Sequence, residues 1–227
     1  MLSFSRAALS RKALLAASLF LTTSLLAFSA SARIEMGKDY DDMITPQPVT
    51  TGSKIEVLEF FSYACPHCAK MEPSVEAWSK KLPKDVVFKR SPVTFNETIT
   101  PLVKAYFALE SMGLLEKMTP RLFDAIHNTH ELSDIGENGI TEWMGTQGVN
   151  AKQFGAAINS FGIAGKTSGA KQMQKRYGIN GIPTFVVDGK YSTSPELTGS
   201  EAATIKVINE LIAKARQERG APKGRSK

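Results

Sequence analysis

Residues 55–68 have the sequence IEVLEFFSYACPHC, in which an apolar run is followed by the motif CPHC at residues 65–68. The run is apolar at both alternating sets of positions except for Glu56 and Glu59, a pattern typical of a strand buried on both faces of a sheet. Pro66 suits the first turn of a helix, where its missing N–H group costs nothing. The stretch therefore predicts a central strand, a short loop and a helix that begins at the motif.

The motif contains the only two cysteines among 227 residues. A lone C-x-x-C pair between a strand and a helix is typical of thioredoxin-like redox sites. The alternative is a structural disulfide, but in the chain-entropy model a bridge that closes so short a loop gains only about 2 kcal/mol, against roughly 3 kcal/mol for a fifteen-residue loop. Such a bridge stabilises a long chain poorly, so we interpret Cys65 and Cys68 as a redox pair.

The N-terminus has the pattern of an export signal. Three basic residues precede an apolar stretch at residues 13–30, which ends in the small-residue pattern Ala30-Ser31-Ala32 that signal peptidase accepts. We therefore predict that residues 1–32 are a cleavable signal peptide. An uncleaved anchor is the alternative, because the stretch is at the short limit for a membrane span. Export leads to an oxidising compartment, where a disulfide persists.

Charge adds little to the functional assignment. The net charge is +6, and the predicted leader holds three of the positive charges and no acidic residue, which leaves +3. Several of the remaining positive charges lie in residues 216–227, which are expected to form a frayed, solvated end, with residues 220–227 as a disordered basic tail. A membrane-surface or nucleic-acid role of the tail is the alternative, and we expect no nucleic-acid partner.

The rest of the sequence predicts one α/β domain interrupted by helices. Strand signals are present before residue 98 and after residue 165, but between them apolar residues recur at helical spacing. We therefore assign residues 33–97 and 166–219 to the α/β domain and residues 98–165 to an inserted all-helical domain.

Individual elements follow from the same patterns. The polar residues 33–53 predict an extended segment with one short strand, and Thr119 is a suitable N-cap for a helix that begins at Pro120. Asp188-Gly189 predicts a two-residue hairpin. The remaining predicted elements are helices at residues 66–81, 168–177 and 200–216 and strands at residues 86–89, 184–187 and 190–192.

Two segments resemble those of a known family. Residues 58–68, LEFFSYACPHC, resemble the active-site segment of the DsbA family of periplasmic thiol:disulfide oxidoreductases, and residues 181–191, GIPTFVVDGKY, resemble that family's cis-proline strand and hairpin. The helical block lies where this family inserts a helical domain into a thioredoxin fold. The resemblance covers nearly all of the chain after the leader, so it implies an α/β protein with a thioredoxin fold and an inserted all-helical domain.

The resemblance also implies a function. A monomeric periplasmic protein of this family donates its disulfide to newly exported proteins, needs no cofactor beyond that disulfide, and is reoxidised by a quinone-linked membrane oxidase of the DsbB type. The alternatives are an exported isomerase or reductase, or a non-catalytic periplasmic chaperone. An isomerase of this kind usually has an added dimerisation domain, and residues 33–53 are too short to supply one.

The motif itself predicts how the two sulfurs divide the chemistry. Cys65 at the start of a helix meets unpaired N–H groups and the positive end of the dipole, and His67 adds a donor or a positive charge. Both favour the Cys65 thiolate, so the reduced protein is stabilised and the disulfide becomes a strong oxidant. Cys68, one turn further, is expected to be shielded. The alternative for His67 is an exposed residue without effect.

Glu59 is a second candidate. A carboxyl group inside an apolar strand loses its hydration, which raises its pKa. It is then able to exchange a proton with Cys68, and the resemblance matches Glu59 to the family's buried acid. The alternative is a solvated carboxylate on an edge strand.

Ile182-Pro183 precedes the predicted hairpin. Only about 5–6% of X–Pro bonds in folded proteins are cis, so the dipeptide alone favours trans. The resemblance implies instead a cis Pro183 against the cysteines, with the Ile182 backbone free to pair with an extended substrate.

The other two histidines give weak signals. His127 and His130 are expected on a polar helix or at its end, exposed to solvent. Their spacing and their separation from the cysteines do not fit a zinc site. Haem attachment needs a histidine directly after the second cysteine, where this chain has Ala69. We expect no metal site.

Overall fold

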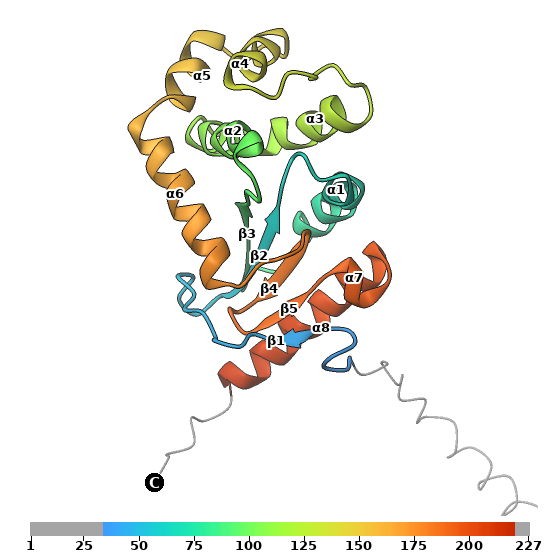
Figure 1. Ribbon diagram of the computed structural model, residues 1–227. Helices are drawn as coiled ribbons and strands as arrows, with labels where there is room; N and C mark the ends of the chain where they lie inside the picture. Colours follow the sequence, from blue (N-terminus) through green and yellow to red (C-terminus); the bar gives the residue numbers. More distant parts are fainter. Residues whose placement is uncertain (1–33, 221–227) are drawn as a thin grey trace, which may run out of the picture. The chain divides into compact units, whose positions relative to one another are not determined.

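The computed structural model describes residues 34–220, so the predicted signal peptide and residues 221–227 of the predicted tail lie outside the described residues. Figure 1 shows a mixed sheet with helices packed around it. The strands follow the order β1-β5-β4-β2-β3, and only β2 and β3 are parallel neighbours. They are β1 (Asp41–Asp42), β2 (Ile55–Phe61), β3 (Val86–Pro92), β4 (Thr184–Val187) and β5 (Tyr191–Thr193).

Strand β2 is an internal strand of this sheet and is buried on both faces, as its sequence predicts. All of its residues are buried, and it pairs with β3 on one side and with β4 on the other. Val57 faces a cluster with Phe185 and Val187, whereas Leu58 and Phe60 face a second cluster. The strand is apolar at both alternating sets of positions because other elements cover both faces of the sheet and bury its side chains there.

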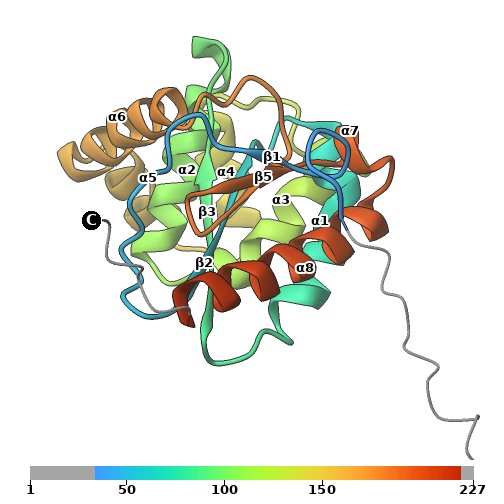
Figure 2. The ribbon, with the colours of Figure 1, turned by 90° about the horizontal axis from the view of Figure 1, so that it is seen from below.

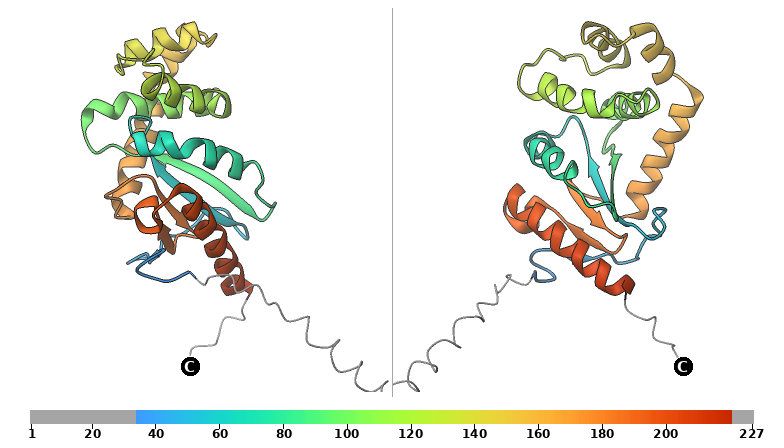
Figure 3. Two further views of the ribbon diagram at one scale, coloured as in Figure 1. Left: turned by 90° about the vertical axis from the view of Figure 1, so that its right-hand side faces the viewer. Right: turned by 180° about the vertical axis from the view of Figure 1, so that it is seen from behind.

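Helices cover the two faces from different parts of the chain. Helices α1 (Pro66–Ser79) and α8 (Glu201–Gly220) pack on the face of Val57, and Figure 2 shows α8 running along the sheet from below. The C-terminal end of α6 (Phe161–Arg176) and the following Tyr177 pack on the other face. Figure 3 shows α6 and α1 on opposite sides of the sheet.

A helical block lies next to one end of β2 (Figure 1) and surrounds Phe61 and Tyr63 with apolar side chains. Its elements are the 3-10 helix η1 (Glu97–Ile99), α2 (Thr100–Ser111), α3 (Leu115–His127), α4 (Glu137–Thr146) and α5 (Ala151–Ile158); a short α7 (Pro195–Thr198) follows β5. Within residues 34–220, no helix is both long enough and apolar enough to cross a membrane.

The starts of helices α3 and α6 differ from prediction. Helix α3 begins at Leu115 and contains Pro120, because Met118 is fully buried and Thr119 is 3% exposed, so core packing extends the helix ahead of the proline. Helix α6 begins at Phe161, where the hydroxyl of Ser160 accepts the N–H of Ile163. It therefore runs through the predicted boundary at residues 165–166.

The predicted hairpin turn is present between β4 and β5. Asp188 and Gly189 both have positive φ (55° and 66°), and the Lys190 N–H donates to the Val187 carbonyl at 3.0 Å, so the expected turn is confirmed.

Helix α8 runs to Gly220 rather than to residue 216. The prediction of a frayed end from residue 216 is wrong for residues 216–220, because Arg216 pairs with Asp85 and Arg219 pairs with Asp188.

Candidate active site at the start of helix α1

Cys65 is the N-cap of α1. Its backbone is extended (φ −89°, ψ 117°), Pro66 occupies the first helical position, and the Cys65 carbonyl accepts the N–H of Ala69 at 3.0 Å. Cys65 is partly exposed, whereas Cys68 is 1% exposed, and both are free thiols in this structure. The helix therefore presents one sulfur at its tip and buries the other, as the sequence predicts.

The thiolate of Cys65 is stabilised. The pKa of Cys65 is lowered to about 6, and the largest cause is a hydrogen bond from the Cys68 side chain, which partial burial opposes. The backbone N–H groups of Cys68 and His67 and the charge of His67 contribute to the same shift. The predicted effects of the helix start and of His67 are thus both present, and the neighbouring sulfur exceeds them.

Cys68 shows the opposite shift. Burial is the main cause that raises the pKa of Cys68, and the hydrogen bond and charge of Cys65 raise it further. The negative charge therefore resides on the accessible sulfur and the proton on the buried one.

The predicted cis-proline segment lies next to the cysteine motif. The Ile182–Pro183 peptide bond is cis, as the resemblance implies. The Cys65 Sγ lies 3.7 Å from the Ile182 carbonyl oxygen, to which it donates when it is protonated. The structure thus brings together residues that are 117 positions apart in the sequence.

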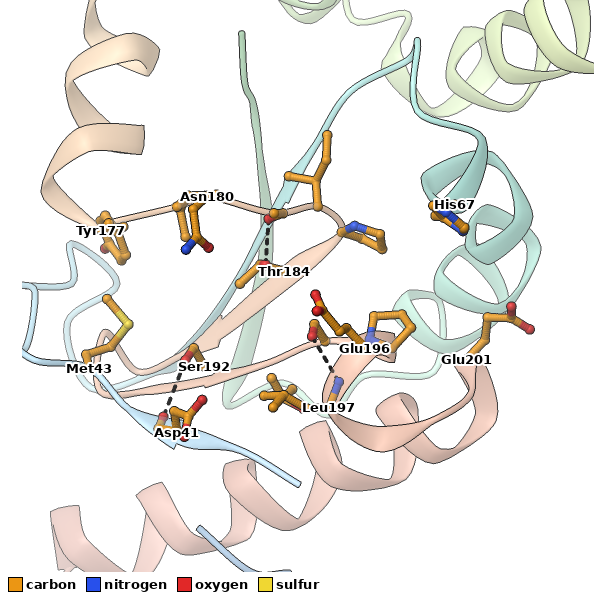
Figure 4. A pocket seen from close by; sticks show the side chains of 18 residues that line it. Asp41, Met43, His67, Tyr177, Asn180, Thr184, Ser192, Glu196, Leu197 and Glu201 are labelled. Carbon is orange, nitrogen blue, oxygen red and sulfur yellow. Dashed lines mark hydrogen bonds between the residues drawn. The ribbon is translucent and has the colours of Figure 1, made fainter. Parts of the chain in front are cut away.

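A pocket of about 700 Å³ opens beside this contact. His67 from α1 and Ile182 and Pro183 from the loop before β4 contribute to its lining. Figure 4 shows His67 on one side of the pocket and Tyr177 and Asn180 on the other, with Ser192 on β5 and Glu196 below. The pocket is open to one side of the redox pair, and it is large enough to receive side chains of an extended peptide.

Glu59 is buried beneath the motif, at 2% exposure, which excludes the edge-strand alternative. Burial raises the pKa of Glu59, and the charge of Arg90 opposes this shift. The Arg90 Nε donates to Glu59 at 2.7 Å, and its two terminal nitrogens donate to Glu72 at 2.6 and 3.1 Å. The charge of Glu59 is also among the causes that raise the pKa of Cys68.

Arg90 and Glu72 did not emerge from the sequence. Glu72 lies one helical turn after Cys68, which places both on one face of α1, and Arg90 is paired with Glu59 in the register of the two parallel strands. Burial raises the pKa of Glu72 to about 7, with Arg90 opposing and Glu59 adding to the shift. One guanidinium faces two buried carboxyl groups, so the cluster retains a proton near neutral pH.

The two remaining histidines differ in their surroundings. His130 is exposed, as predicted, and lies in the loop after α3, where its Nδ1 is 3.1 Å from the carbonyl oxygen of Ile126 in the last turn of that helix. The prediction of a solvated His127 is wrong. It is partly buried, because its ring lies near that of Phe123 and its Nε2 lies 2.8 Å from the carbonyl oxygen of Tyr63, two residues before Cys65.

The sheet, the cysteine pair at a helix start and the facing cis-proline define a thioredoxin-fold thiol–disulfide oxidoreductase. The particular family follows from the sequence, because the family model of the DsbA-like thioredoxin domain matches residues 56–205. The chain belongs to this family.

Relatives and solved structures agree with this assignment. The chain is 39% identical to the thiol:disulfide interchange protein DsbA of Burkholderia cepacia over 86% of this chain and 92% of that protein. It is 38% identical to the DsbA of Bordetella parapertussis over 90% and 96%, respectively. The crystal structure of Pseudomonas aeruginosa DsbA matches with a TM-score of 0.77 and 34% identity, covering 83% of this chain and 97% of that chain.

Proposed function

We propose that the Cys65–Cys68 disulfide oxidises pairs of thiols in newly exported proteins of the periplasm. The family establishes thiol–disulfide exchange. The observation that carries the direction of the reaction is the opposite pKa shift of the two sulfurs. The stabilised thiolate lowers the free energy of the reduced protein relative to the disulfide form. Reduction of the disulfide is therefore favourable, and the disulfide is a good oxidant.

The reaction begins at the accessible sulfur. A substrate thiolate attacks the Cys65 Sγ, the bond between the two cysteine sulfurs breaks, and Cys68 leaves and takes up a proton. The second substrate thiolate then attacks the substrate sulfur of the mixed disulfide. Cys65 leaves as a thiolate, which its low pKa favours. The substrate has lost two electrons and the protein has gained them, so no further cofactor is required.

Glu59 supports the proton balance of this sequence. Cys68 carries a proton in the reduced protein and none in the disulfide, so a group below it must supply and take back that proton. The buried cluster of Glu59, Arg90 and Glu72 retains a proton near neutral pH, and the charge of Glu59 acts on Cys68. We assign the proton exchange to Glu59.

The loop before β4 receives the substrate chain. The Ile182 backbone borders the sulfur of Cys65, and Pro183 and His67 line the adjoining pocket. Pairing with main-chain atoms makes few demands on side chains, which suits a broad range of unfolded substrates. Pro66 starts α1 without a donor of its own and leaves the helix tip open.

The cycle also needs a partner. The protein ends each reaction reduced, and we propose that a quinone-linked membrane oxidase of the DsbB type restores the disulfide of the monomeric protein. The predicted signal peptide is consistent with this compartment.

The test is transfer of the disulfide to a reduced peptide with two cysteines. We expect the oxidised protein to oxidise one peptide per protein molecule, and we expect Cys65→Ser and Cys68→Ser to be inactive, because neither variant can form the disulfide. A chaperone predicts instead that Cys65→Ser keeps the function, so oxidase activity in that variant refutes the proposal.

A further inference from the structure

The segment before Cys65 is a tight turn. The Cys65 N–H donates to the Ser62 carbonyl at 3.0 Å, which leaves Tyr63 and Ala64 as the two central residues of the turn. This turn fixes the backbone of Cys65 at the start of α1 and so the direction in which its sulfur points. The N–H groups that stabilise the thiolate, by contrast, belong to the helix itself.

Both polar atoms of the central peptide group have partners. The N–H of Ala64 donates to the Ser62 Oγ at 3.2 Å. The carbonyl of Tyr63 lies 2.8 Å from the His127 Nε2. A carbonyl oxygen only accepts, so Nε2 carries the proton and is the donor. The turn therefore depends on a side chain that is 64 residues away in the sequence.

The same helix also holds the side chain of Tyr63. The hydroxyl of Tyr63 lies 3.0 Å from the Thr119 Oγ1, and its ring meets that of Phe123 edge-on with the centroids 5.2 Å apart. Tyr63 is 1% exposed. Helix α3 thus contacts the carbonyl, the hydroxyl and the ring of Tyr63, a residue that lies two positions before the reactive cysteine.

We propose that His127 is a positioning residue of the redox site. Its Nε2–H holds the turn that directs the Cys65 sulfur toward the N–H donors of α1, so it contributes to the stability of the thiolate without touching the sulfur. The inference rests on the proposed redox role of Cys65. It assigns a task at the redox site to a helix of the inserted block.

The test compares two amides that differ in reach. In His127→Gln the side-chain nitrogen lies about as far from the backbone as Nε2 and can donate to Tyr63, whereas in His127→Asn it is one methylene too short. We expect His127→Asn to shift the thiol–disulfide equilibrium with glutathione about threefold toward the disulfide form of the protein, which is about 14 mV at 29.6 mV per tenfold change. The pKa of the Cys65 thiolate should rise in parallel.

His127→Gln is expected to behave as the unsubstituted protein in both measurements, and so is the control His130→Asn on the exposed neighbour. Thermal unfolding of every variant separates stability from the redox readouts. If His127→Asn loses stability but keeps the equilibrium constant and the thiolate pKa, or if His127→Gln is as impaired as His127→Asn, the inference is refuted. A reductant-like potential of the unsubstituted protein refutes instead the proposed function.

Discussion

Two cysteines of the same motif lie in opposite environments, one at the tip of α1 and the other in the layer below it, next to the cluster of Glu59, Arg90 and Glu72. At the tip, Cys65 is partly exposed and meets donors, which lower its pKa to about 6. Below it, Cys68 is buried next to a charged cluster, and burial raises its pKa. The comparison teaches that position along one helical turn is sufficient to decide which sulfur holds the charge. An accessible thiolate and a protected thiol are what directed disulfide donation requires.

The lower layer differs from the tip in another respect, since its charged side chains are mostly shielded from water. The Arg90 side chain is 13% exposed, and its partners Glu59 and Glu72 are 3% and 6% exposed. Removing a partner from a buried ion pair leaves a charge without compensation, whereas removing an exposed partner does little. The stability of the protein should therefore be sensitive to this layer.

The largest expected effect is that of Arg90→Met. We expect it to lower the free energy of unfolding by about 3–5 kcal/mol, because Glu59 and Glu72 remain buried without a cation. Denaturant unfolding measures the loss. The matched control is Arg216→Met, which breaks a pair that Arg216 forms with Asp85 through two hydrogen bonds. The two side chains are 41% and 53% exposed, so this variant should lose far less stability. Equal losses in the two variants would contradict the contrast between buried and exposed charge.

The next effect is the difference in reactivity between the two sulfurs. In Cys68→Ser, the hydroxyl that replaces the thiol can still donate to Cys65, so we expect the remaining cysteine to be alkylated with a midpoint near pH 6. In Cys65→Ser, the remaining Cys68 is buried and protonated. At neutral pH we expect it to react at least about tenfold more slowly, because the thiolate is the nucleophile. Similar rates and midpoints in the two variants would contradict the assignment.

The same shift links stability to pH. The Cys65 pKa is about 6 in the folded protein against an ordinary value of 9.0, so the unfolded chain binds more protons between these values. The contribution of this thiolate to the stability of the reduced protein is fully present above pH 9 and is lost as the pH falls through about 6. Comparison of reduced protein with Cys65→Ser across this range isolates the contribution. A constant difference would contradict the shift.

The smallest expected effect is that of Tyr63→Phe, which tests the contact between the loop before α1 and helix α3. The substitution removes the hydrogen bond to Thr119, whose side chain is buried at 3% exposure, and should cost about 1 kcal/mol of unfolding free energy. The carbonyl of residue 63 keeps its bond to His127, so the Cys65 pKa should not change. A shifted alkylation midpoint in this variant would show that the hydroxyl itself acts on the redox site.

The elements near the motif were predictable because local patterns determine them. An apolar run that is buried on both faces, a proline in the first turn of a helix and the turn residues Asp188-Gly189 each have one dominant structural solution, and the structure contains all three. The family resemblance added the cis bond at Ile182–Pro183, which propensity alone disfavours.

The missing parts depend on long-range contacts. Arg90 reaches Glu59 only because the register of β2 and β3 makes these residues partners, and register is not visible in either strand alone. His127 looked like a solvated residue because its acceptor, the Tyr63 carbonyl, belongs to a distant loop. Helix α3 begins ahead of Pro120 because burial of Met118 outweighs the local signal of Thr119.

The most direct test of the central claim is the reduction potential of the Cys65–Cys68 pair against glutathione. On the scale where DsbA itself lies at about −120 mV and thioredoxin at about −270 mV, the stabilised Cys65 thiolate predicts a value near the oxidising end. A value near that of thioredoxin would mean that the opposite environments of the two sulfurs do not stabilise the reduced form. The protein would then be an exported reductase rather than a disulfide donor.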